Sequence, residues 1–87
     1  METQNEKLRE ACNDAFLCFQ KIGDTNYSEI QSKLQFVIGS YDYDKNPVGL
    51  YEVGKVSLEK LKELKEVYPR KVNKQVISGL EKTLQVN

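Results

Sequence analysis

Apolar residues recur at helical spacing in four successive segments of this 87-residue chain, and this periodicity constrains the fold more than any other feature. The first stripe steps by 4, 3, 4 and 3 residues and consists of Leu8, Cys12, Ala15, Phe19 and Ile22. Such spacing places its members on one face of a helix. Before the stripe, Thr3 and Glu6 have the spacing of a capping box, and Gly23 after it suits a left-handed helix end. We predict a helix over residues 4–22.

Three further stripes follow the first. They consist of Tyr27, Ile30, Leu34, Val37, Ile38 and Tyr41; of Leu50, Gly54, Ser57, Leu61, Leu64 and Tyr68; and of Val72, Val76, Ile77, Leu80 and Leu84. Asn46-Pro47 suits a helix start and Pro69 a helix end. Because Gly54 and Ser57 are small, we expect another helix to approach closely there. We predict the remaining helices over residues 27–41, 47–68 and 70–85.

Residues 34–56 allow a second interpretation. Phe36-Val37-Ile38 is rich in residues that favour strands, and Asp44–Pro47 could turn the chain into a hairpin. The helical period covers more residues than the strand alternation does, so the sequence favours helix. We therefore predict an all-α fold, a small antiparallel bundle of about four helices. The alternative is an α+β fold with a β-hairpin over 34–56. Given the length, we expect residues 1–87 to be a single helical domain without a separable linker or tail.

The charges balance overall but differ between the two halves of the chain. The full sequence has 13 basic and 13 acidic residues. Residues 1–44 carry four bases against eight acids, a net of −4, and residues 45–87 carry nine bases against five acids, a net of +4. A protein whose main partner is nucleic acid usually has a basic excess, so we do not expect that partner. The asymmetry suits packing of one half on the other, or antiparallel self-association.

The cysteines and the first residues indicate a cytoplasmic protein. Met1–Glu6 is polar and acidic, so we expect no signal peptide, and no apolar run approaches the ~20 residues of a membrane span. Cys12 and Cys18 lie six residues apart on one predicted helix, or about 9 Å along its axis, which is too far for a disulfide between them. Free thiols are typical of a reducing compartment.

The residue types give little support to catalysis, metal binding or a cofactor. The chain has no histidine, which removes the commonest general base and the commonest zinc ligand, and two cysteines alone cannot build a zinc site. The sequence D-x-D-x-N over residues 42–46 opens like a calcium loop. However, Pro47 replaces the glycine that the turn requires, and Val53 replaces the final glutamate. We predict a protein that is not an enzyme and has no metal or cofactor.

Two features are candidates for binding a partner. Leu17 and Phe36 each lie opposite the apolar stripe of their own helix, and two such residues could form one exposed patch. Tyrosines and carboxylates also cluster near residues 41–44, where a recognition loop would offer large contact areas. The candidate partner-binding residues are Leu17, Phe36, Tyr41, Asp42, Tyr43 and Asp44.

The chain also has one local concentration of basic residues. The candidate basic patch consists of Lys62, Lys65, Arg70, Lys71 and Lys74. Glutamates alternate with these lysines, as on ordinary solvated helices, and no aromatic residues alternate with them to stack bases. We therefore predict a helical protein–protein interaction or regulatory module, with a homodimer as one form. The alternative is a nucleic-acid-associated accessory protein that uses residues 62–74.

Overall fold

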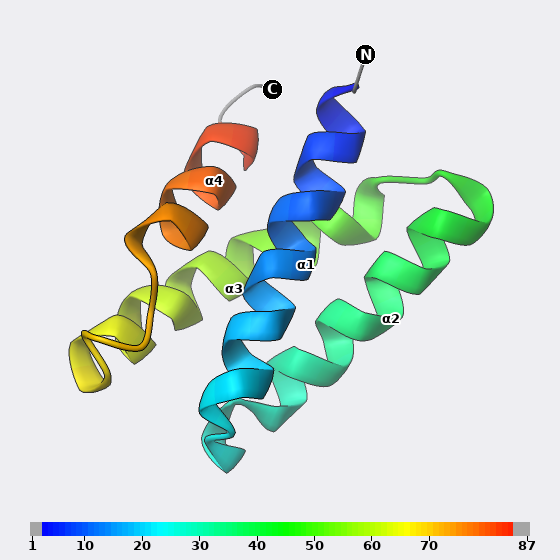
Figure 1. Cartoon of the computed structure of the whole chain (residues 1–87). Coiled ribbons are helices and arrows are strands. Elements are labelled where there is room, and N and C mark those ends of the chain that lie inside the picture. The colour runs from blue at the N-terminus through cyan, green and yellow to red at the C-terminus, as the bar shows by residue number, and fades with distance from the viewer. Residues whose placement is uncertain (1–2, 85–87) are drawn as a thin grey trace.

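The computed structural model describes residues 3–84, which form four packed α-helices and one short 3-10 helix. The elements are α1 (Gln4–Ile22), η1 (Thr25–Tyr27), α2 (Ser28–Asp44), α3 (Val48–Val67) and α4 (Lys74–Leu84). Figure 1 shows α1 between α2 and α4, with α3 crossing behind them. The all-α bundle is confirmed. Residues 3–84 contain no strand, so the alternative hairpin over 34–56 is wrong.

The bounds of α1 agree with the prediction because side chains and a glycine mark both of its ends. The Glu6 backbone N–H donates to Thr3 Oγ1 at 3.1 Å. Gly23 adopts a left-handed conformation with φ 70°, and its N–H donates to the Phe19 carbonyl at 3.0 Å. A residue without a side chain adopts this conformation at little cost. The capping signals in the sequence therefore predicted both ends of this helix at the correct residues.

The connection between α2 and α3 is shorter than the sequence predicted. The second helix extends to Asp44, three residues beyond its predicted end, and Lys45 closes it with φ 60°. The Lys45 N–H donates to the Tyr41 carbonyl at 2.6 Å. Asn46 then accepts a hydrogen bond from the Val48 N–H at 3.1 Å, which fixes the start of α3. The tyrosines and carboxylates of residues 41–44 therefore lie in a helical turn and not in a loop.

The last helix begins at Lys74 and not at residue 70. The N–H groups of Lys71 and Val72 both donate to the Tyr68 carbonyl, which makes a turn after Pro69. Asn73 then caps α4, because its Oδ1 accepts from the Gln75 N–H at 2.8 Å. The predicted last residue of this helix, 85, lies outside the described residues.

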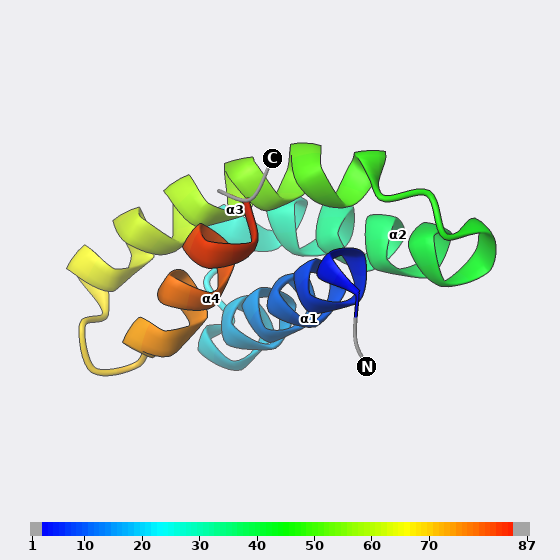
Figure 2. The ribbon, with the colours of Figure 1, turned by 90° about the horizontal axis from the view of Figure 1, so that it is seen from above.

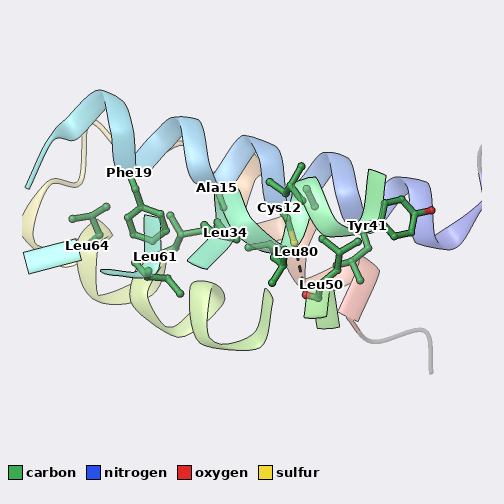
Figure 3. Close-up of a cluster of buried hydrophobic side chains, with 14 of the residues drawn as sticks. Cys12, Ala15, Phe19, Leu34, Tyr41, Leu50, Leu61, Leu64 and Leu80 are labelled. Atoms are coloured by element: carbon green, nitrogen blue, oxygen red, sulfur yellow. Dashed lines mark hydrogen bonds between the residues drawn. The ribbon is translucent and has the colours of Figure 1, made fainter. Parts of the chain in front are cut away.

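The apolar stripes of all four helices meet in one core (Figure 3). Phe19, Leu61 and Leu64 lie toward one end of the drawn cluster, and Tyr41 lies at the other. A Cβ on Gly54 would lie 3.4 Å from Leu84 Cδ2 and 3.6 Å from Cys12 Sγ, so α1 and α4 both approach α3 closely there. The buried apolar residues are Leu8, Ala11, Cys12, Ala15, Phe19, Ile30, Leu34, Val37, Ile38, Tyr41, Leu50, Leu61, Leu64, Val72 and Leu80.

Two other helical glycines should respond oppositely to an added methyl group. A Cβ on Gly39 would meet nothing within 4 Å, whereas one on Gly49 would lie 3.0 Å from Val37 Cγ1. Because alanine favours helix over glycine, we expect Gly39→Ala to raise the free energy of unfolding by about 0.5–1 kcal/mol. Gly49→Ala should gain less or lose stability, since Val37 must move. Urea denaturation of both variants measures the difference, and equal gains would contradict the close α2–α3 packing.

Candidate interaction surfaces

Most of the exposed large apolar side chains in residues 3–84 lie on one pair of helices. Six such side chains occur in the described part of the chain, and five of them belong to α2 and α3. They are Leu17 on α1, Phe36 and Tyr43 on α2, and Val48, Val56 and Val67 on α3. We call the exposed side of α2 and α3 that carries these five residues the α2–α3 face. Large exposed apolar patches on a small protein commonly mark interaction sites.

The three exposed valines are distributed along the whole length of α3. Val56 and Val67 are separated by eleven residues, close to three helical turns, whereas Val48 lies eight residues before Val56 and is rotated from it by about 80° around the helix. Two of the valines border α2, because Val48 shares a groove with Phe36, and Val56 shares another with Lys33. Figure 2 shows α3 along one side of the molecule and α1 and α4 along the other. The valines were not among the predicted site residues, although their spacing was visible in the sequence.

Two shallow grooves run between α2 and α3 on this face. One has a volume of about 290 Å³ and is lined by Phe36, Val37, Ser40, Asp44, Asn46, Val48, Gly49 and Glu52. The other, of about 220 Å³, is lined by Asn26, Glu29, Ile30, Lys33, Val56 and Lys60. Both combine apolar side chains with charged ones. Such grooves suit the apolar anchors and flanking charges of a partner surface.

Leu17 lies elsewhere, so it does not form one patch with Phe36. It lines a groove of about 380 Å³ between α1 and the beginning of α4, together with Asp14, Cys18, Lys21, Lys71, Asn73, Gln75 and Val76. This groove shares no lining residue with the two grooves between α2 and α3. The sequence correctly indicated that both side chains are exposed, but the fold places them on different surfaces.

The predicted tyrosine and carboxylate cluster also divides into separate environments. Tyr41 is only 3% exposed and belongs to the core. Asp42 accepts two hydrogen bonds from Arg9, at 3.1 and 2.8 Å, and these bonds with the guanidinium charge hold the pKa of its carboxyl below its usual value. Tyr43 is almost fully exposed, and Asp44 Oδ1 accepts from the Asn46 N–H at 2.9 Å. Only Tyr43 and Asp44 therefore remain available on the surface.

Three of the five residues in the candidate basic patch have partners within the chain. Lys62 pairs with Glu81 at 3.5 Å. Lys65 donates to the carbonyls of Pro69 and Val72, which fastens the turn after α3. The Lys71 ammonium lies 5.9 Å from the centre of the Tyr68 ring. The other two, Arg70 and Lys74, are exposed and have no ion pair among residues 3–84.

The two cysteines are free and differ in burial. Cys12 is fully buried, and burial raises the pKa of its thiol to about 12. Its Sγ lies 3.8 Å from the Leu50 carbonyl oxygen, to which it donates. Cys18 is half-buried at the groove beside Leu17, and burial raises its pKa as well. Because the thiolate is the nucleophile, neither cysteine is activated for chemistry.

We expect alkylation to distinguish these two thiols. Native protein treated with iodoacetamide at pH 8 should be modified slowly at Cys18 and not at Cys12, because reagent reaches Cys12 only when the helices separate. Peptide mass spectrometry over time would measure the two rates. In urea above the unfolding midpoint, both thiols should react at similar rates. Faster labelling of Cys12 in the native protein would contradict its position in the core.

Residues 3–84 offer neither a metal site nor a membrane-spanning helix beside these surfaces. Among residues 3–84, no three side chains of histidine, cysteine, aspartate or glutamate lie where they could hold a metal ion. No helix in that range is long and apolar enough to cross a membrane. Comparisons of the chain with protein-family models, with curated proteins and with solved structures found no match. The candidate site therefore depends on the geometry of the chain itself, and the α2–α3 face is its most pronounced surface feature.

Proposed function

We propose that this chain is a protein–protein interaction module that binds a helical partner through the α2–α3 face. One observation carries the proposal: five of the six exposed large apolar side chains in the described residues gather on these two helices. Exposure of Phe36 at 75% has no benefit for the isolated chain, since burying a phenylalanine side chain is favourable by about 1.5–3 kcal/mol. A partner that covers this face would recover part of that free energy.

The shape of the face supports a helix as the bound element. The third helix has 20 residues, so its exposed valines, from Val48 to Val67, are spread over about 28 Å. An amphipathic helix carries apolar anchors along several turns, and it could place them against exposed apolar side chains that extend over a similar length of α3. The grooves beside Phe36 and Val56 would receive such anchors, and the charged residues around them would meet polar groups of the partner.

The test compares affinity capture by the wild type and by three single variants. We expect Phe36→Asp and Val56→Asp to lose a partner that the wild type retains, because each introduces a charge into the apolar face. Leu17→Asp is the matched control, since Leu17 is also half-exposed but lies beside α4. Circular dichroism should show that all three variants are folded. Retention of the partner by both face variants, or its loss with Leu17→Asp, would refute the proposal.

A further inference from the structure

We infer that the α2–α3 face binds a second copy of this chain, with the two α3 helices antiparallel and Val56 on the two-fold axis. The inference rests on the proposed function and names the partner. In a two-fold interface, a residue on the axis meets itself, so that position must be uncharged. Val56 satisfies this requirement: it is 44% exposed and lies near the middle of α3.

The charges on either side of Val56 are self-complementary. Glu52 lies one helical turn before Val56 and Lys60 one turn after it, and the grooves on either side place both residues on the side of α3 that borders α2. Antiparallel pairing about Val56 brings position 52 of one copy opposite position 60 of the other. Glu52 of each copy therefore faces Lys60 of the second copy, which gives two symmetric ion pairs. Parallel pairing would oppose like charges at both positions.

The ion pair that Lys60 makes within its own chain leaves it able to form this contact. Within one chain, its Nζ lies 3.7 Å from Glu63, and the two side chains are 44% and 59% exposed. An exposed pair of this kind contributes little to stability, so it does not prevent a second interaction. In the dimer, Lys60 would lie between Glu63 of its own chain and Glu52 of the second copy. Removal of its positive charge should then leave carboxylates facing one another across the interface.

The same register fills the groove beside Phe36. Val48 lies about 12 Å from Val56 along the helix axis, and Val67 lies about 17 Å from it in the other direction. Val67 of the second copy therefore falls about 5 Å beyond Val48, over the groove that Phe36 and Val48 line. The antiparallel arrangement also brings the Asp44 end of one copy near the Arg70 end of the other. Both residues are exposed, and neither has an ion pair among residues 3–84.

Charge exchange between positions 52 and 60 tests this arrangement in the full chain. Sedimentation equilibrium of the wild type at high protein concentration should give a mass of about 20 kDa, twice the 10.0 kDa of one chain. Lys60→Glu should return the mass to that of the monomer, and Glu52→Lys should raise the dissociation constant about tenfold or more. An equimolar mixture of these two variants should dimerise, because each supplies the charge that the other lacks. The double variant Glu52→Lys/Lys60→Glu should dimerise as well.

One control variant separates the outcomes. Lys62→Glu makes the same change in charge as Lys60→Glu, but Lys62 pairs with Glu81 of α4, so the dimer should persist. A wild type that remains at 10.0 kDa, or a mixture of the two charge variants that does not dimerise, would overturn the inference. Neither result would refute the proposed function, because the α2–α3 face would then bind a different helical protein. That function fails only if affinity capture is insensitive to Phe36→Asp and Val56→Asp.

Discussion

Replacing Phe19 with alanine is expected to lower the free energy of unfolding by about 3–5 kcal/mol. The Phe19 side chain is 1% exposed, and its ring stacks on that of Tyr27 with 5.7 Å between the centroids. Truncation would leave a cavity between α1 and the elements that pack against it. For a chain of 87 residues, the total free energy of unfolding is on the order of 4–13 kcal/mol, so this loss would remove at least about a quarter of it.

Urea denaturation monitored by far-ultraviolet circular dichroism would measure the loss, with Phe36→Ala as the matched control. Both substitutions remove the same atoms from a helix of the same bundle, but Phe36 is largely exposed. The control should therefore change the free energy of unfolding by no more than about 0.5 kcal/mol at concentrations where the chain is monomeric. Similar losses for the two variants would mean that α2 is rotated relative to the structure described above.

Replacing Gln35 with proline should destabilise the protein by about 3 kcal/mol or more. Gln35 is exposed in the middle of α2, so its side chain contributes little to packing. Proline lacks the N–H that bonds to the carbonyl of Gln31, and its ring would clash with that carbonyl. Thermal and urea denaturation would both report the loss.

Gln35→Ala separates this backbone effect from the loss of the side chain. Alanine retains the N–H and has a high helix propensity, so its effect should be within about 0.5 kcal/mol of the wild type. A proline variant as stable as the alanine variant would argue against a continuous helix over Ser28–Asp44.

The sequence predicted the helices best where side-chain signals marked both ends. For α1, the cap at Thr3 and the glycine at position 23 gave the correct bounds. For α4, the periodicity predicts the helix correctly, but Pro69 puts its predicted start at residue 70, before the true start at Lys74. The true cap is Asn73, and it follows a turn in which two N–H groups donate to the Tyr68 carbonyl. Local sequence does not show that a lysine from the preceding helix, Lys65, will hold such a turn in place.

The candidate site was less predictable because it depends on which helices are neighbours. Periodicity within one helix correctly indicated that Leu17 and Phe36 face away from their own stripes. This periodicity could not indicate that α4 would lie beside Leu17 and α3 beside Phe36. The exposed valines lie well away from the α3 stripe around the helix, so the same periodicity could have identified them. It could not indicate which of them would adjoin α2.

The packing around Gly54 also bears on how the sequence can vary. The nearest atoms to a Cβ at that position belong to Leu84, Cys12 and Leu8, at 3.4 to 3.8 Å, which is ordinary contact for one methyl group. Any larger side chain would have to displace α1 or α4. A library of substitutions selected for folding should therefore retain only glycine and alanine at position 54, whereas position 39 should accept nearly every helix-forming residue. In evolution, the most restricted position of α3 would be one without a side chain of its own.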